Sequence, residues 1–259
     1  MKDEFIATVS HEFKTPLAVI NAAVQALEVL CKNELSDKAK GFIRSIHQNS
    51  FRQMRLVNNL LDLTILNSGA LRIQRKNMDI VFATRVIIES VQPYARQKGV
   101  HLQFSSLLPS QRVILDDEKY ERILLNLLSN AIKFTPKGKS IMVMVSKEND
   151  TIVIKVKDKG VGIPAEKQEL IFERFGQVDS SLTRQNEGTG IGLSLVKSLT
   201  GALGGSIILN SQEGKGSIFT LVFPIAAASP VEPELDMCEF ADNHLTHSTA
   251  IEFSDIYFE

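Results

Sequence analysis

Residues 151–162 have the sequence TIVIKVKDKGVG, and this stretch decides the fold expected for most of the chain. Its first eight residues alternate as in a strand, which places Ile154 and Asp158 on the same face. The isoleucine marks that face as the buried one, so a carboxylate is expected to project toward the core, where it needs a hydrogen-bond donor. An exocyclic amine of adenine is a suitable donor. Gly160 and Gly162 follow, where the backbone can turn tightly and approach a ligand.

The segments around this strand predict one sheet covered by helices. Strand patterns occur at residues 71–73, 101–104, 113–115, 141–145, 151–156, 206–209 and 217–223. Helical patterns occur at about residues 80–97, 118–134 and 193–203. Strands with helices between them favour a sheet layered with helices, so we expect an α/β sandwich domain over residues 69–226. A long stretch with little apolar period, residues 159–190, lies inside it, and such loops are usually functional.

Residues 1–68 predict a helical hairpin. Apolar residues recur at steps of three and four on both sides of a polar stretch, residues 32–38. The seam residues are Phe13, Leu17, Ile20, Val24, Leu27, Phe42, Ile46, Met54, Val57, Leu61 and Ile65. A hairpin cannot bury such a seam well alone, and pairing two hairpins gives a four-helix bundle. We therefore expect a homodimer and, overall, an α+β chain.

Composition sets the outer limits. A net charge of −1 gives no electrostatic reason to expect nucleic acid as a partner. Cys31 and Cys238 match no metal-ligand or disulfide spacing, which suits a reducing compartment. No apolar run approaches the length of a membrane span and no signal-peptide pattern is present, so a cytoplasmic location is expected for this chain, even if a longer protein is membrane-anchored. Residues 227–259 contain no Lys or Arg and predict an acidic, flexible tail.

Three short segments are candidates for catalysis or ligand binding. The first is SHEFKTPL, residues 10–17. Pro16 removes the helical hydrogen bond to the carbonyl of Glu12, and His11, Glu12 and Thr15 share one side of the helix. A lone helical histidine is ordinarily a solvated surface residue, and that interpretation is kept for the remaining histidines, His47, His101, His244 and His247. The polar cluster around it sets His11 apart.

The second cluster is a stripe on the helix predicted for residues 118–134. Asn126, Asn130 and Lys133 are spaced by four and three residues, so they lie on one face. Amide oxygens can bind Mg²⁺ and the lysine can meet phosphate charge. A solvated polar face explains the same spacing equally well.

The third cluster is GTGIGL, residues 188–193, just before a helix. Glycines that open onto a helix N-terminus present free N–H groups and a positive dipole to phosphate. No Gly-Lys-Ser/Thr follows, so this is not a P-loop, and no strand precedes it as a dinucleotide fingerprint requires. Together with the asparagine stripe and Asp158, in that order, it predicts a nucleotide site with a mobile lid.

At this point the sequence resembles the sensor histidine kinases over about residues 1–225. Residues 5–17 resemble their H-box and residues 126–135 their N-box. Residues 158–164 resemble the G1 box, 172–175 the F-box and 188–193 the G2 box. Five boxes in family order are far more specific than any one of them. Lys14 stands where arginine is commoner and Ile191 where leucine is commoner, and neither change threatens the assignment.

The resemblance implies a dimerisation hairpin followed by the ATP-binding sandwich of gyrase and Hsp90-type ATPases. His11 would be the phosphoacceptor and Glu12 would orient or deprotonate it, while Thr15 would place a water for dephosphorylation of a partner. Asn126 would hold Mg²⁺, and Asp158 would bind the adenine amine. The other implied nucleotide-binding residues are Asn130, Lys133, Gly160, Gly162, Arg174, Gly188, Thr189, Gly190, Gly192 and Thr220.

The implied activity is ATP-dependent autophosphorylation of His11, followed by transfer to an aspartate of a separate response regulator. An ATP-driven conformational machine on the same fold would carry a glutamate at Asn126, and an amide cannot act as a general base. A degenerate scaffold is disfavoured because His11, Asn126 and Asp158 are intact, and an anti-sigma type serine kinase would not need the hairpin. A sensor region is expected upstream and is missing from this chain.

Overall fold

The computed structural model describes residues 2–31, 34–176, 190–225, 233–235, 240 and 245–254. Side chains are described from residue 12 onward within these ranges, apart from those of residues 67 and 245–247. Two compact units are present. The first comprises residues 1–71 with 250–259, and the second comprises residues 72–249.

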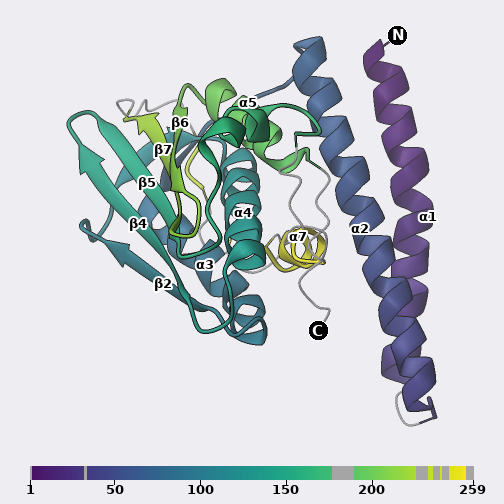
Figure 1. Ribbon diagram of the computed structural model, residues 1–259. Helices are drawn as coiled ribbons and strands as arrows, with labels where there is room; N and C mark the ends of the chain where they lie inside the picture. Colours follow the sequence, from purple (N-terminus) through teal and green to yellow (C-terminus); the bar gives the residue numbers. More distant parts are fainter. Residues whose placement is uncertain are drawn as a thin grey trace. The chain divides into compact units, whose positions relative to one another are not determined.

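The first unit is a hairpin of two long helices, α1 (Lys2–Leu30) and α2 (Asp37–Ser68) (Figure 1). Ser36 begins α2 by accepting a hydrogen bond from the Ala39 N–H at 3.2 Å. Gly69 ends it in the left-handed conformation, with φ of 71°, which glycine adopts without strain. Helix α1 continues through Pro16. The helical hairpin predicted from the apolar period is confirmed.

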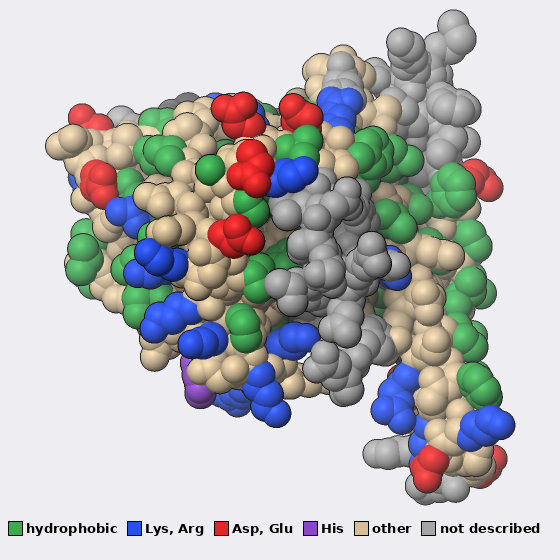
Figure 2. Space-filling model, in the orientation of Figure 1, with side chains coloured by type: hydrophobic (Ala, Val, Ile, Leu, Met, Phe, Trp, Pro, Cys, Tyr) green, Lys and Arg blue, Asp and Glu red, His purple; other side chains and the backbone are tan. Residues whose placement is uncertain are grey.

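The seam of this hairpin is only partly buried within one chain. Leu17 and Val24 of α1 pack inward with Met54 and Leu61 of α2. Alternate seam residues face solvent instead, and Phe13 and Phe42 are 55% and 62% exposed. Figure 2 shows apolar side chains gathered along the hairpin. Within the described part of the chain, both helices therefore have exposed apolar side chains along the hairpin.

The second unit is an α/β sandwich (Figure 1). Its five-stranded sheet has the order β2-β4-β5-β7-β6, in which β2 and β4 are parallel and the other pairs are antiparallel. The strands of this sheet are β2 (His101–Ser106), β4 (Ser140–Glu148), β5 (Thr151–Asp158), β6 (Ser206–Gln212) and β7 (Gly216–Pro224). The helices α3 (Ile80–Gln97), α4 (Asp117–Phe134) and α5 (Gly192–Ala202) lie on one face of it. The α+β class is thus confirmed.

A small two-stranded sheet replaces the first strand expected from the sequence. Its strands are β1 (Lys76–Asp79) and β3 (Arg112–Leu115), and their pairing begins at Lys76 opposite Leu115. The prediction of a strand at residues 71–73 was wrong. The backbone N–H of Gln74, just beyond it, donates to the carboxylate of Asp116 at 2.7 Å instead of to a neighbouring strand.

The core of the second unit is formed by the inner face of the sheet and the apolar face of α4. Ile152 and Ile154 of β5 are fully buried, as are Leu124 and Leu128 of α4. Burial of these side chains supplies the main driving force for packing helix on sheet. The long segment after β5 contains two short 3-10 helices, η1 (Ala165–Lys167) and η2 (Leu170–Phe172).

Parts of the acidic tail are described, and they make contacts within both units. The Asn77 N–H of β1 donates to the carbonyl of Pro233 at 2.9 Å, and Arg112 pairs with Glu234 at 3.2 Å. In the hairpin unit, Arg55 donates to the carbonyl of Glu252 at 2.8 Å, near the end of α7 (Leu245–Glu252). The flexibility predicted for the whole tail stays a prediction.

One stretch of the described chain, Glu12–Leu30, is long and apolar enough to cross a membrane by length and composition, with a mean hydropathy of 1.2. This corrects the sequence-based statement that no run approaches that length. Core helices of soluble proteins can have the same length and composition.

Candidate functional site

The site begins at the end of β5 with Asp158, a carboxylate that is only 6% exposed. Its Oδ1 accepts hydrogen bonds from the N–H groups of Gly160 at 2.8 Å and Ser217 at 3.2 Å. Burial raises the pKa of Asp158, and these two hydrogen bonds act in the opposite direction. Both of these hydrogen bonds are to Oδ1. One carboxylate oxygen is therefore fixed, and the other is available to a ligand.

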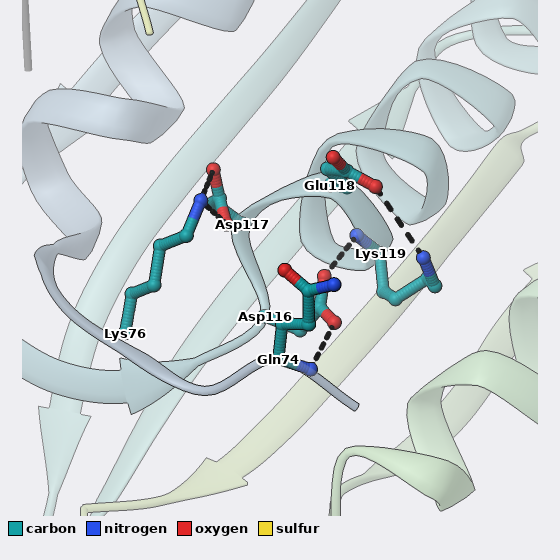
Figure 3. Close-up of polar contacts among 6 residues, drawn as sticks. All are labelled: Gln74, Lys76, Asp116, Asp117, Glu118 and Lys119. Atoms are coloured by element: carbon teal, nitrogen blue, oxygen red, sulfur yellow. Dashed lines mark hydrogen bonds and ion pairs between the residues drawn. The ribbon is translucent and has the colours of Figure 1, made fainter. Parts of the chain in front are cut away.

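The start of α4 is held by its acidic first residues (Figure 3). Asp116 caps the helix by accepting from the Lys119 N–H at 3.0 Å, and its other oxygen accepts from the Gln74 N–H. Asp117 forms an ion pair with Lys76 at 2.9 Å. These contacts tie the chain that enters the second unit to α4. They fix the helix that carries the predicted asparagine stripe.

Asn126 lies in the middle of α4 and is 2% exposed. Its Nδ2 donates to the Arg122 carbonyl at 3.0 Å, one turn back along the helix. Its Oδ1 approaches the start of α5 so closely that a Cβ on Gly192 would lie 2.7 Å away. Because the amide nitrogen is held by the helix, the oxygen is the atom presented to the site. An amide oxygen is a suitable ligand for Mg²⁺, so the residue fits the ion implied by the resemblance.

Helix α5 begins at Gly192, beside Asn126. Among the described residues, no side chain caps its first N–H groups. Gly190 has φ of 67°, and its carbonyl accepts from the Phe175 N–H at 2.9 Å. Phe175 also has a positive φ of 62°. This backbone pair joins the two ends of the segment between η2 and α5, and the uncapped end of α5 is suited to an anion.

Helix α4 brings these parts together. Near its C-terminus, a Cβ on Gly160 would lie 2.6 Å from the carbonyl oxygen of Phe134, and the Val161 N–H donates to that oxygen at 3.3 Å. Near its middle, Asn126 contacts Gly192. The loop after Asp158 and the start of α5 therefore lie along one helix. Helix α4 is thus the element that both the loop after Asp158 and the start of α5 contact.

The other predicted nucleotide residues differ in how the structure places them. Asn130 and Lys133 are half-buried on the same stripe of α4 as Asn126, and the Lys133 amine lies 5.5 Å from the centre of the Phe134 ring. Arg174 is exposed beside Phe175. Gly188 and Thr189 lie outside the described residues.

Strand register separates Thr220 from Asp158. Thr220 lies on β7 opposite Lys155, three residues beyond Ser217, and it is Ser217 that contacts Asp158. Sequence reasoning missed Ser217, together with Ser211 and Gln168, whose contacts are described below. The signal that could have found them is the glycine-rich turn GKGS, residues 214–217, between the last two strands.

The candidate phosphoacceptor lies in the other unit. His11 is part of α1, but its side chain is outside the described part of the chain. Glu12 and Thr15 are exposed on the same helix, near the Pro16 that α1 accommodates. Thr15 follows His11 by one helical turn.

Two family matches follow these two units. Residues 115–227 match the histidine kinase-, DNA gyrase B-, and HSP90-like ATPases. Residues 1–69 match the His Kinase A (phospho-acceptor) domain. A phosphoacceptor hairpin joined to an ATPase-type sandwich defines the histidine kinase class.

Individual proteins support the same class. The chain is 34% identical to the circadian input-output histidine kinase CikA of Thermosynechococcus vestitus, over 92% of this chain and 33% of that protein. It is 36% identical to the sensor histidine kinase WalK of Bacillus subtilis, over 85% of this chain and 36% of that protein. The structure of full-length ShkA in complex with AMPPNP matches with a TM-score of 0.72 and 28% identity, over 88% of this chain and 47% of that chain.

The chain therefore belongs to the sensor histidine kinases. It carries their phosphoacceptor hairpin and their ATP-binding domain. It spans about a third of the length of the two named relatives.

Proposed function

We propose that this chain is an autophosphorylating protein histidine kinase, which transfers the γ-phosphoryl group of ATP to His11 and then to an aspartate of a response regulator. The observation that carries the proposal is the geometry of Asn126. Its nitrogen is held by the Arg122 carbonyl and its oxygen faces the start of α5. An amide in that place can hold a cation but cannot deprotonate water. Hydrolysis of ATP is therefore disfavoured, and the γ-phosphoryl group is transferred to a stronger nucleophile than water.

The nucleotide would be held by groups from three elements. Asp158 accepts a hydrogen bond from the adenine amine through its available oxygen. The uncapped N–H groups of α5 and the amine of Lys133 meet phosphate charge. When bound at Asn126, Mg²⁺ supplies charge neutralisation on the phosphate oxygens. Phosphoryl transfer has a loose transition state, so positioning and charge neutralisation provide most of the catalysis.

The acceptor chemistry belongs to His11 and Glu12. A neutral imidazole is available near pH 7, because its unperturbed pKa is about 6.5. Its nitrogen forms a bond to the γ-phosphorus as the bond to the oxygen of the leaving ADP breaks. The proton released from the imidazole passes to the Glu12 carboxylate. The phosphoryl group then passes from the His11 nitrogen to an aspartate carboxylate of the regulator, as the phosphorus–nitrogen bond breaks and a phosphorus–oxygen bond forms.

A homodimer would complete the hairpin. Phe13, Ile20 and Leu27 of α1 and Phe42 and Ile46 of α2 leave large apolar surfaces exposed. Two such hairpins bury these faces against each other in a four-helix bundle. The apolar face supports this dimer more directly than any other feature of the chain.

The test is labelling with Mg-ATP that carries a radioactive γ-phosphate. The label should resist alkali and be lost in acid, as expected for a phosphoramidate. His11→Gln should abolish it while ATP binding persists. His101→Gln, a change to an exposed histidine on β2, is the matched control and should label normally. Undiminished labelling of His11→Gln would overturn the proposal.

A second activity, dephosphorylation of the regulator, is favoured by the exposure of Thr15. Its hydroxyl can donate to and accept from a water, one helical turn beyond His11. Thr15→Ala should therefore slow dephosphorylation of the regulator while labelling of His11 stays within a few-fold. Thr15→Ser keeps the hydroxyl and should retain both activities. A parallel loss of both in Thr15→Ala would show that the residue only supports the helix near Pro16.

A further inference from the structure

The loop that follows Asp158 is fastened to the turn between β6 and β7 by a serine side chain. Ser211, near the end of β6, accepts a hydrogen bond from the Ile163 N–H at 2.8 Å. The same hydroxyl lies 3.1 Å from the Gly216 carbonyl and 2.9 Å from the hydroxyl of Ser217. One side chain thus joins the loop, residues 159–163, to both strands of the hairpin.

A glutamine makes a second connection between the same segments. Gln168 directly follows η1, and its Nε2 lies 3.1 Å from the Ile163 carbonyl. The same nitrogen lies 2.9 Å from the Ser211 carbonyl. An amide group has two N–H donors, so both hydrogen bonds can form together. We call Ser211 and Gln168 the latch.

The backbones of the loop at residues 159–163 and of the turn between β6 and β7 are also closely packed against each other. The Gly214 N–H donates to the Val161 carbonyl at 2.7 Å. Gly162 has φ of 68°, and a Cβ there would clash with the Gln212 carbonyl. Gly216 has φ of 94°, and a Cβ there would clash with the carbonyl of Asp158 itself. The loop at residues 159–163 and the turn between β6 and β7 are therefore in close backbone contact beside Asp158.

Both hydrogen bonds to the fixed oxygen of Asp158 come from the segments that the latch joins. Gly160 belongs to the loop and Ser217 to the start of β7. If the loop moved away from β7, the two donors would separate and the carboxylate would be free to rotate. The latch thus controls the direction of the oxygen left for a ligand.

We propose that Ser211 and Gln168 are positioning residues that hold Asp158 at the angle needed to accept the 6-amino group of adenine, and that they thereby set the preference for ATP over GTP. The proposal rests on the nucleotide site of the proposed function. Guanine carries a carbonyl at the same position, so a fixed carboxylate faces an acceptor and neither group is satisfied. A site built around a hydrogen bond rejects the analogue that cannot make it. A carboxylate that can rotate loses the bond to adenine and avoids the clash with guanine.

The test is equilibrium binding of ATP and GTP to the full chain, by competition with a fluorescent ATP analogue. Ser211→Ala should weaken ATP binding roughly three- to tenfold, the range for losing one neutral hydrogen bond. GTP binding should become stronger, because the carboxylate can turn away from the guanine carbonyl, so the ATP/GTP affinity ratio falls by more than ATP binding alone does. Gln168→Ala should act in the same direction. At saturating ATP, the rate of His11 labelling should stay within about twofold, because a positioning effect on adenine is expressed in KM.

Two further variants separate positioning from a structural role. Ser211→Thr keeps the hydroxyl and should retain the ATP/GTP affinity ratio of the wild-type chain. Ser206→Ala changes an exposed serine on the same strand and should change neither affinity. A lower melting temperature in Ser211→Ala with an unchanged ATP/GTP ratio would overturn the proposal, as would equal losses for both nucleotides. The binding ratio can be measured whether or not His11 is labelled, so a failure of the proposed kinase activity would be seen separately.

Discussion

The two units of this chain differ in how far one copy completes its own core. In the sandwich, Leu124 and Leu128 of α4 and Ile152 and Ile154 of β5 are fully buried by their own chain. In the hairpin, Phe13, Ile20 and Leu27 of α1 and Phe42 and Ile46 of α2 are exposed to solvent. Soluble proteins rarely leave such continuous apolar faces without a partner. The difference indicates that the ATP-binding domain buries its apolar core within one chain. The hairpin needs a second copy to bury its apolar face.

Buried polar groups without a partner occur in both units: among the described residues, Asn77 Oδ1 and Thr135 Oγ1 in the sandwich have no hydrogen-bond partner. In the sandwich, Asp158 receives two backbone hydrogen bonds on one oxygen. In the hairpin, both polar atoms of the Asn21 side chain and the Ser50 hydroxyl are buried without a hydrogen-bond partner among the described residues. Buried polar groups are normally paired, and a polar side chain in a helical seam specifies register and number of helices at a cost in stability. Asn21 and Ser50 thus lower the stability of the hairpin within one chain.

The largest expected effect is on assembly. Ile46→Glu places a charge on the exposed apolar face of α2 and should weaken the dimer by at least about a hundredfold, because a twofold interface loses the buried side chain twice. Nucleotide binding by the sandwich should be unaffected. Sedimentation equilibrium measures the first effect and titration with an ATP analogue the second. Leu107→Glu, at an 83% exposed position beyond β2, is the control and should stay dimeric. A dimer of unchanged affinity in Ile46→Glu would contradict the assignment of this face.

The next effect is on the sandwich alone. Asp158→Asn replaces a charged acceptor with an amide that must choose its orientation. Losing a charged hydrogen-bond partner costs about 1.5–3 kcal/mol, or roughly tenfold to more than a hundredfold in ATP affinity. The oligomeric state should not change. Asp150→Asn, in the exposed turn between β4 and β5, is the matched control for the same measurement. Wild-type affinity in Asp158→Asn would remove this residue from the site.

A smaller effect is the pH dependence of ATP binding. Burial raises the pKa of Asp158 above that of an exposed aspartate. The ionised form accepts the adenine amine, so ATP affinity should fall as the pH is lowered toward this raised pKa. The fall should begin at a higher pH than an exposed aspartate would give. ATP titrations at successively lower pH check this, with Asp158→Asn as the reference. An identical pH profile in the variant would assign the effect to another group.

The smallest effect is on the stability of the hairpin. Asn21→Leu removes two buried, unpaired polar atoms and should raise the free energy of unfolding by about 1 kcal/mol. Thermal unfolding measures the change, and Asn49→Leu, at an exposed asparagine of α2, should change it little. In Asn21→Leu, the helices of the dimer should pair in more than one register, because the polar group no longer specifies a single one. A lower stability in Asn21→Leu would show that the dimer satisfies this side chain.

The units also differ in what their sequences could predict. Apolar spacing predicts both long helices of the hairpin, because a helix repeats its environment every three to four residues. Alternation along β5 places Asp158 on the buried face. The latch could not be predicted, since the contacts of Ser211 and Gln168 depend on the register of β6 against β7 and on a long loop. The strand expected at residues 71–73 failed because the Asp116 side chain binds the backbone just beyond it.

The central claim is that the γ-phosphoryl group goes to His11 and not to water, and a single-turnover experiment tests it most directly. The chain is held in excess over γ-labelled Mg-ATP, and the reaction is stopped in alkali. The products are separated into the peptide that contains His11 and free phosphate. The account predicts that most of the label is on the His11 peptide at early times, with little free phosphate. Label released as phosphate, with none on that peptide, would contradict it.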